Sequence, residues 1–238
     1  MSAKVSTKNH KICLIGCSGR MGQEIQRLAQ SMGLGKIICG VDTNSHQASL
    51  PVKNTIDQIN AQDIDVVIDF SSPELFGKVV QWCAKHKKPL VSGTTGIQEN
   101  HKKMLAAAAQ SVGIAWAPNM SLGIATLRKA LAVFSQIKEF DFQIEEFHHN
   151  KKKDNPSGTA LLLQNSLQEA VGRGLPAPIG IRGGGIFGTH KVWAMSDEEV
   201  LMFEHQALNR GVFAKGALIV AQQIVAKGPG SYGIDDFI

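Results

Sequence analysis

The sequence predicts an α/β protein, with a doubly wound parallel sheet joined to a smaller α+β domain that contains a mixed sheet. As far as residue 119, short apolar strands alternate with helical segments. Repeated strand–helix–strand units of this kind form parallel sheets with right-handed crossovers. Beyond residue 119 the predicted strands cluster with few helices, which favours a mixed sheet.

The spacing of apolar residues, together with glycine and proline at the ends of segments, predicts the helices and strands of the first half. Residues 11–16, KICLIG, are a short apolar run ending in glycine, which is typical of a buried parallel strand. Gly33 ends the first helix and Pro73 begins the second. We expect strands at 11–16, 36–42, 65–70, 89–95 and 113–119, and helices at 20–33, 73–87 and 98–111.

The second half is expected to form its own domain before the last helix returns to the first one. Residues 141–149 alternate like a strand, and residues 210–227 are strongly apolar on one helical face. We expect helices at 121–137, 158–171 and 210–227, and strands at 141–149, 178–182, 189–195 and 199–208. The predicted domains are therefore 1–120, completed by 210–238, and 121–209.

Composition narrows the class of protein. The chain has 238 residues, 43% hydrophobic and 19% charged, which is ordinary for a soluble globular protein. No apolar run approaches the ~20 residues that span a bilayer, so we expect no membrane partner. Residues 1–10 are polar and lack the apolar core of a signal peptide, so we expect a frayed tail on a cytoplasmic protein. The four cysteines form no C-x-x-C pair, which predicts reduced, mostly buried thiols and no metal site.

The net charge of +5 indicates which partners suit the chain. Its basic residues are scattered, apart from lysine groups at 85–88, 102–103 and 151–153. Scattered basic side chains usually lie on the solvated surface, and their positive charge favours the binding of anionic small molecules. No recognition element for DNA or RNA is visible, so we expect no nucleic-acid partner.

The first strand runs into a glycine-rich turn, G-x-x-G-x-x-G, that opens a helix. Gly16 permits the tight turn, Gly19 lets the backbone approach a pyrophosphate, and Gly22 lets the helix close on the strand. Amides at the helix N-terminus then bind the phosphates. An acidic residue, Asp42, ends the second strand. The pattern predicts a dinucleotide site, although a merely structural turn is the alternative.

Two further features concern the cofactor. A carboxylate at Asp42 accepts hydrogen bonds from both ribose hydroxyls of NAD and repels a 2′-phosphate, and Thr43 adds no positive charge. This favours NADH over NADPH, but Arg20 is placed to reach a 2′-phosphate. Residues 93–95 end the fourth predicted strand and residues 117–119 end the fifth, so both loops are expected to border the nicotinamide. A plain turn and helix cap is the other interpretation of 93–95.

Residues 145–160, EEFHHNKKKDNPSGTA, contain an unusual concentration of polar chemistry. In a strand His148 and His149 point to opposite faces, so they serve different roles. The amides of Gly158 and Thr159 begin a predicted helix and would form an anion hole. Cations beside such a helix end suit a site that binds a small polyanion and donates a proton to it. The alternative is that the histidines are structural and that the lysines form a solvated turn.

The motifs together resemble those of a known family. They are GCSGRMG (16–22), DFSSPE (69–74), GTTG (93–96), APNMSLG (117–123), E-x-H-H-x-x-K-x-D-x-P-S-G-T (146–159) and R-G-G…G-T-H (182–190). Over residues 11 to nearly the C-terminus the chain resembles dihydrodipicolinate reductase, also called 4-hydroxy-tetrahydrodipicolinate reductase, of lysine and diaminopimelate biosynthesis. The resemblance implies a Rossmann-type nucleotide domain completed by the C-terminal helix, and a second domain for substrate binding and oligomerisation. It also implies a homotetramer that reduces a cyclic dicarboxylate imine with NADH or NADPH.

Site residues follow from the resemblance by position. The implied proton donors are His148 and Lys152, and the implied substrate contacts are His149, Gly158 and Thr159. The implied cofactor contacts are Gly16, Cys17, Ser18, Gly19, Arg20, Met21, Asp42, Gly93, Thr94, Thr95, Ala117, Pro118, Asn119 and Met120. Asn150 and Lys151 stand where many members carry Arg and His, and Thr43 replaces a basic residue.

Three alternatives stay open at this point. The first is another nicotinamide-dependent amino-acid or imine dehydrogenase on the same scaffold, since one fold hosts many chemistries. The second is a regulator that senses NADH without turnover, against which His148 and Lys152 argue. The third, a nucleic-acid binder, predicts steep salt dependence. Substrate screening separates the first from the predicted reductase.

Overall fold

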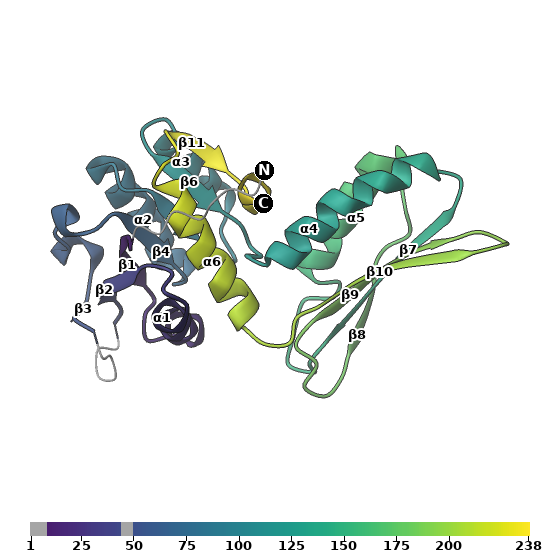
Figure 1. The fold of residues 1–238 in the computed structure, drawn as a ribbon, viewed down its shortest axis with the longest axis horizontal. Coiled ribbons are helices and arrows are strands. Elements are labelled where there is room, and N and C mark those ends of the chain that lie inside the picture. Colours follow the sequence, from purple (N-terminus) through teal and green to yellow (C-terminus); the bar gives the residue numbers. More distant parts are fainter. Residues whose placement is uncertain (1–8, 44–49) are drawn as a thin grey trace. The chain divides into compact units, whose positions relative to one another are not determined.

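A computed structural model of the chain describes residues 9–43 and 50–238 (Figure 1). The predicted tail at 1–10 lies outside the described residues except for its last two. Contacts divide the chain into two compact units. Unit 1 is Met1–Met120 with Arg210–Ile238, and unit 2 is Ser121–Asn209.

Unit 1 is built on a parallel sheet of seven strands in the order β11-β6-β5-β4-β1-β2-β3. Buried apolar side chains fill the central strands, because a sheet covered on both faces has no solvated side. The strands are β1 (Lys11–Ile15), β2 (Lys36–Val41), β3 (Val52–Lys53), β4 (Val66–Asp69), β5 (Leu90–Ser92), β6 (Gly113–Trp116) and β11 (Gly230–Tyr232).

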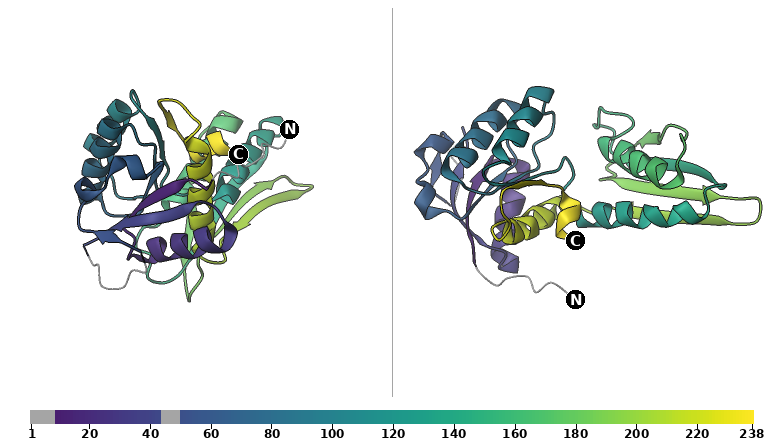
Figure 2. Two further views of the ribbon diagram at one scale, coloured as in Figure 1. Left: turned by 60° about the vertical axis from the view of Figure 1, so that its left-hand side comes forward. Right: turned by 90° about the horizontal axis from the view of Figure 1, so that it is seen from above.

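Helices cover both faces of this sheet (Figure 1). They are α1 (Arg20–Met32), α2 (Pro73–His86), α3 (Glu99–Ala108) and α6 (Gly211–Ile224). Helices α1 and α6 pack together on one face, and α2 and α3 on the other, as the views of Figure 2 show. Phe76 and Val80 of α2 are fully buried in the core beneath the second pair. The doubly wound α/β architecture predicted from the sequence is confirmed.

The elements of unit 1 begin and end for local reasons that the sequence shows. Helix α1 ends at Gly33, whose φ of 64° lies in the left-handed region that glycine tolerates. Pro73 occupies the first turn of α2, where its missing N–H costs no hydrogen bond. The strands predicted at 89–95 and 113–119 are shorter than expected and end at Ser92 and Trp116. Strands β3 and β11 were not predicted.

Unit 2 contains a mixed sheet of four strands in the order β10-β9-β7-β8. Strand β7 pairs antiparallel with β9 and parallel with β8. The strands are β7 (Asp141–His148), β8 (Ile179–Arg182), β9 (Thr189–Met195) and β10 (Val200–Gln206). The predicted mixed sheet is confirmed, with slightly shorter strands.

Two helices, α4 (Leu122–Ala130) and α5 (Gly158–Val171), cover one face of this sheet (Figure 1). Each begins at a serine whose hydroxyl accepts a backbone N–H of the first turn. The single helix predicted at 121–137 is wrong in its second half, because residues 131–136 form a 3₁₀-helix. There Phe134 packs its ring against Phe142 and Phe203.

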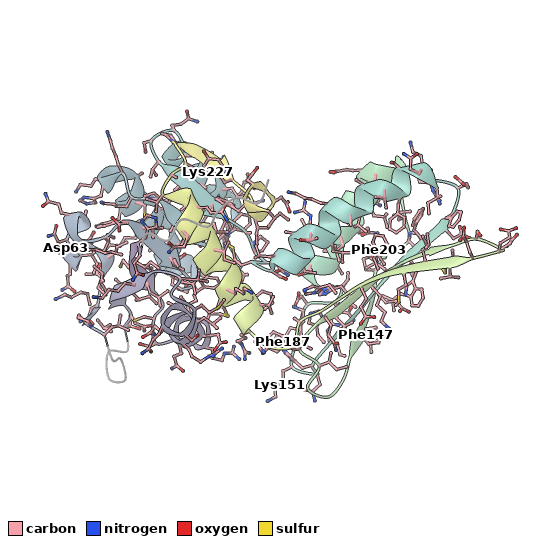
Figure 3. All side chains as sticks on the ribbon, in the orientation of Figure 1. Asp63, Phe147, Lys151, Phe187, Phe203 and Lys227 are labelled. Carbon is pink, nitrogen blue, oxygen red and sulfur yellow. The ribbon has the colours of Figure 1, made fainter. Side chains whose placement is uncertain are left out.

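On the other face of the mixed sheet, no helix of the described part of unit 2 packs. Phe203 lies on the helix side, whereas Phe147 lies on the uncovered side (Figure 3). Register places further apolar side chains on that uncovered side, namely Ile179, Ile181, Trp193, Met195, Val200 and Met202. We call these residues together with Phe147 the open face.

Two expectations from composition concern the cysteines and membrane-spanning helices. All four cysteines are free thiols, three of them buried, as predicted. Within residues 9–43 and 50–238, no helix combines the length and apolar character that crossing a bilayer requires. In the same part of the chain, His, Cys, Asp and Glu side chains form no group of three or more placed to hold a metal ion.

Candidate active site

The glycine-rich turn of unit 1 has the geometry of a phosphate-binding loop. Gly16 has a φ of 76°, and a Cβ there would collide with the carbonyl group of Phe70. At Gly22 a Cβ would overlap the carbonyl oxygens of Gly16 and Cys17, so only glycine lets α1 pack this closely on the turn. Gly19 is the N-cap of α1 and offers no side chain to the first-turn amides. Those amides and the positive end of the helix suit a pyrophosphate.

Asp42 lies immediately after β2, next to this turn. Its Oδ2 accepts a hydrogen bond from the Ser18 amide at 2.9 Å, so the carboxylate and the turn are in direct contact. A carboxylate in this place accepts hydrogen bonds from ribose hydroxyls. Arg20 is exposed, and the Cys17 side chain is buried, so any cofactor contact of Cys17 comes from its backbone. The residues present therefore fit a nicotinamide dinucleotide.

The loops after β4 and β5 are held from within by a buried carboxylate. Asp69, at the end of β4, accepts hydrogen bonds from the hydroxyls of Ser71, Ser92 and Thr94 at 2.6–2.8 Å. Burial raises the pKa of Asp69, although the three hydroxyls oppose that shift. Trp116 Nε1 donates to the Thr94 carbonyl at 3.0 Å. The predicted contacts at 93–95 thus form one fixed loop, in which the Thr94 hydroxyl faces Asp69.

The last predicted cofactor segment is Ala117, Pro118, Asn119 and Met120. Ala117 and Met120 are buried, and the Ala117 amide donates to the Ser92 carbonyl at 3.1 Å. The Met120 carbonyl lies against Gly216 of α6, where a Cβ would overlap it. The segment therefore follows β6 at the carboxyl edge of the sheet, next to the 93–95 loop. Ligands of open α/β sheets bind at this edge.

In unit 2 the histidine segment leaves β7 beneath the start of α5. His148 is the last residue of β7 and is 8% exposed, with Nδ1 hydrogen-bonded to Glu146 Oε2. Burial lowers the pKa of His148, and Glu146 opposes that shift. His149 lies beyond the strand, and its Nδ1 is buried and has no hydrogen-bond partner among the described residues. The two histidines therefore have different surroundings, and their separate roles stay predictions.

Lys152 and the N-terminus of α5 complete this group. Lys152 Nζ forms an ion pair with Asp154 Oδ1 at 2.9 Å and also contributes to lowering the pKa of His148, so its charge lies near the ring. Ser157 caps α5, and its hydroxyl accepts from the Ala160 amide at 3.2 Å. Gly158 and Thr159 are the first two helical residues after that cap. A helix start beside an imidazole and an ammonium group suits a carboxylate ligand.

Several residues of this site were not assigned roles from the sequence. Glu146 is fully buried and forms an ion pair with Arg182 at 2.7 Å. His190 lies on β9 opposite Glu146, with its ring 5.2 Å from that of His148 between centroids. Glu146 and His148 are two residues apart in a strand, so they share a face. That spacing was a usable signal for Glu146. Arg182 and His190 are the ends of the R-G-G…G-T-H motif, and strand register places them beside Glu146.

His190 gives unit 2 a distinct acid sensitivity. Burial, followed by the nearby charge of His148, lowers the pKa of His190 to about 3. Between pH 6.5 and 3 the unfolded chain therefore binds a proton that the folded chain does not. The free energy of unfolding is expected to fall as pH drops through this window, by up to about 1.4 kcal/mol per pH unit for this group.

His190→Gln is expected to make the free energy of unfolding less dependent on pH, as measured in urea titrations at pH 7, 6 and 5. The control is His86→Gln in α2, and an unchanged slope in His190→Gln contradicts the assignment.

A glycine-rich turn after the first strand, and a carboxylate after the second, define a dinucleotide-dependent oxidoreductase of the Rossmann type. Models described as dihydrodipicolinate reductase match the chain at residues 10–120 (N-terminus) and 123–238 (C-terminus). The chain belongs to the dihydrodipicolinate reductase family.

Individual relatives agree with the family. A 4-hydroxy-tetrahydrodipicolinate reductase from Bdellovibrio bacteriovorus is 46% identical over 232 residues, covering 97% of each chain. One from Caldanaerobacter subterraneus is 35% identical over 246 residues, covering 96% of this chain and 98% of the relative. A dipicolinate-bound dihydrodipicolinate reductase from Paenisporosarcina sp. TG-14 superposes with a TM-score of 0.81 at 19% identity. It covers 96% of this chain and 99% of that one, and the likeness shows the shared fold.

Proposed function

We propose that this chain reduces 4-hydroxy-tetrahydrodipicolinate to tetrahydrodipicolinate with NADH or NADPH, in the biosynthesis of diaminopimelate and lysine. One observation carries the proposal beyond family membership. A buried His148–Glu146 pair, the Lys152 ammonium and the N-terminus of α5 are gathered in unit 2. An acid group beside an anion site is what reduction of a cyclic dicarboxylate needs. Four free thiols suit the reducing cytoplasm, where such an enzyme is expected to work.

Substrate binding is assigned to unit 2. The amides of Gly158 and Thr159 would hold one carboxylate of the ring, because a helix N-terminus carries partial positive charge, and that carboxylate would share the Gly158 amide with Asp154 or displace Asp154 from it. The unpartnered Nδ1 of His149 would donate to a carboxylate as well. Fixing the ring at two carboxylates orients its reactive carbon, which is a large part of the rate gain in such reactions.

Proton delivery is assigned to His148 and Lys152. Loss of water from the 4-hydroxylated ring gives a conjugated imine, and a bound dinucleotide would supply the hydride that reduces it. Negative charge then develops across the nitrogen and carbon atoms of the ring, and a proton must be added to complete the reduction. The imidazolium of His148 supplies that proton, an effect typically worth ~10²–10⁴-fold. The Lys152 ammonium stabilises the developing charge and is a second possible donor.

Cofactor binding is assigned to unit 1, with a preference for NADH. The Asp42 carboxylate lies beside the glycine-rich turn, where it would bind both ribose hydroxyls and repel a 2′-phosphate. Thr43 supplies no positive charge there. Arg20 is exposed at the start of α1 and would give NADPH partial access. The proposed cofactor contacts are those predicted from the sequence, with Cys17 contributing its backbone.

The reaction is tested by mixing purified protein with freshly generated 4-hydroxy-tetrahydrodipicolinate and following the nicotinamide absorbance. NADH and NADPH are used in separate cuvettes. Rapid substrate-dependent oxidation is expected, faster with NADH. No oxidation with either cofactor, in folded protein that still binds NADH, contradicts the proposed reaction. A higher kcat/KM with NADPH contradicts the preference based on Asp42 and leaves the reaction itself intact.

We further propose that the chain assembles as a homotetramer through the open face of unit 2. Seven apolar side chains on a sheet without a covering helix form a patch that soluble monomers rarely expose. Met202→Glu is expected to reduce the assembly to smaller species in size-exclusion chromatography with light scattering, because a carboxylate is costly to bury unpaired. Met32→Glu on α1 is a matched control, since Met32 and Met202 are 43% and 42% exposed. An assembly of unchanged mass in Met202→Glu contradicts this proposal.

A further inference from the structure

We infer that Glu146 is a positioning residue that fixes the His148 ring, so that Nδ1–H points at its carboxylate and Nε2 is the nitrogen that delivers the proton. The catalytic part of this inference rests on the proposed reduction. The geometric part does not, because the orientation and tautomer of the ring can be measured without substrate.

The Glu146 carboxylate is fully buried and receives hydrogen bonds on both oxygens. Oε1 accepts from the Ser157 amide at 3.0 Å and from Arg182 Nη2 at 2.7 Å. Oε2 accepts from Arg182 Nη1 at 2.9 Å and pairs with His148 Nδ1. An ionised carboxylate can only accept, so Nδ1 carries the hydrogen of this pair.

Arg182 keeps the Glu146 carboxylate ionised and fixes its orientation. Burial raises the pKa of Glu146, but the hydrogen bonds from Arg182, His148 and the Ser157 amide outweigh it and hold the pKa below its ordinary value. The two parallel bonds from the guanidinium also fix the plane of the carboxylate. Arg182 is itself tied to the Asp154 carbonyl at 2.6 Å. Glu146 is thus joined both to the proton donor and to the loop that starts α5.

The second ring nitrogen of His148 lies beside Gly188. A Cβ at position 188 would stand 3.0 Å from Nε2, so glycine leaves room next to this nitrogen. With Nδ1–H held by Glu146, only the imidazolium form has a proton to give, and that proton is on Nε2. In the proposed reaction the Nε2–H bond breaks and the proton passes to the reduced ring. Neutral His148 keeps Nδ1–H, and water restores the proton on Nε2.

Charged and titratable groups face His148 from each neighbouring element, namely Glu146 on β7, Lys152 after β7, Arg182 on β8, His190 on β9 and, beyond it, His205 on β10. Burial lowers the pKa of His148, and Lys152 and Arg182 lower it further. Glu146 raises it, through its hydrogen bond and its charge. Removing the charge of Glu146 therefore takes away the group that favours the imidazolium.

The test is Glu146→Gln, read by NMR of protein carrying histidine labelled with ¹⁵N in the ring and ¹³C at Cε1. The His148 signal is assigned by its loss in His148→Gln. In the unaltered protein the neutral ring is expected to carry its hydrogen on Nδ1. In Glu146→Gln the pKa of His148 is expected to fall by about one unit, and the Nδ1–H tautomer to lose its dominance.

Kinetics supply the second readout. Activity needs protonated His148, so kcat falls as pH rises through its pKa. In Glu146→Gln this descent is expected to move to lower pH by about one unit, which lowers kcat at neutral pH about tenfold. NADH affinity is expected to stay unchanged. Glu145→Gln, one residue along the same strand and bonded to Trp193 Nε1 on the other face, is the matched control.

Two results would overturn the inference. One is a Glu146→Gln protein whose His148 keeps the same tautomer and pKa. The other is a loss of kcat that is equal at every pH, which indicates general disorder. If Glu146→Gln does not fold because the partly buried Arg182 is left unpaired, the double variant Glu146→Gln/Arg182→Gln removes that charge and is measured in the same way. Absence of turnover in the unaltered protein contradicts the proposed reaction, and the NMR result still decides the role of Glu146.

Discussion

His148→Gln is expected to lower kcat by about 10²–10⁴-fold, since it removes the imidazolium that protonates the reduced ring. The affinity for NADH is expected to stay the same, because the proposed dinucleotide contacts belong to the other unit. Steady-state kinetics give kcat, and fluorescence titration gives the dissociation constant of NADH. Lys152→Met is expected to show the same division between kcat and cofactor affinity.

The control is His86→Gln, which removes an imidazole from α2, far along the sequence from the site. Equal weakening of NADH binding in His148→Gln and Lys152→Met would contradict the assignment of proton delivery to unit 2. If only one of the two variants loses kcat, that residue is the proton donor and the other has an electrostatic or binding role.

Gly22→Val is expected to weaken NADH binding by about 10–100-fold and to lower the temperature of unfolding. A Cβ at this position overlaps two carbonyl oxygens of the turn, so α1 must move away from the strand it follows. Overpacking of this kind typically costs about 1–3 kcal/mol, and each 1.4 kcal/mol corresponds to a tenfold change in affinity. NADH titration and thermal unfolding measure the two effects.

Gly174→Val provides the comparison, because a Cβ at Gly174 meets no atom within 4 Å. It is expected to leave both NADH binding and the unfolding temperature near their original values. Unaltered NADH affinity in Gly22→Val would show that the glycine-rich turn does not hold the dinucleotide.

The fold was predictable where local sequence and tertiary structure agree. The apolar run at 11–16 and the Pro73 helix start needed no partner to be recognised. Strand β11 was not predictable, because Gly230, Ser231 and Tyr232 have no strand-like pattern and are extended only through pairing with β6. The change to 3₁₀ geometry at residues 131–136 is equally non-local, since the Phe134 ring packs on two other elements.

The residues of the candidate site also divide into those that local sequence indicates and those that only tertiary structure brings together. The residues of contiguous motifs, such as His148 and Lys152, could be named as candidates from the sequence and stay predictions. Glu146 was within reach, because its position alternates with His148 on one strand face. Arg182 stands 36 residues beyond Glu146, and only the parallel pairing of β7 with β8 joins them. A sequence shows that a buried carboxylate needs a cation, but not which cation supplies the charge.

The order of the elements has a consequence for biosynthesis of the chain. Unit 2 interrupts unit 1 between β6 and α6, and β11 pairs with β6 only after residue 230. During translation, therefore, the nascent first sheet stays incomplete until almost the whole chain has left the ribosome. Until then β6 is an open sheet edge and the face packed by α6 is bare, both of which invite aggregation. Premature stop codons after residue 209 are thus expected to produce chaperone-bound or degraded chains rather than a working nucleotide unit.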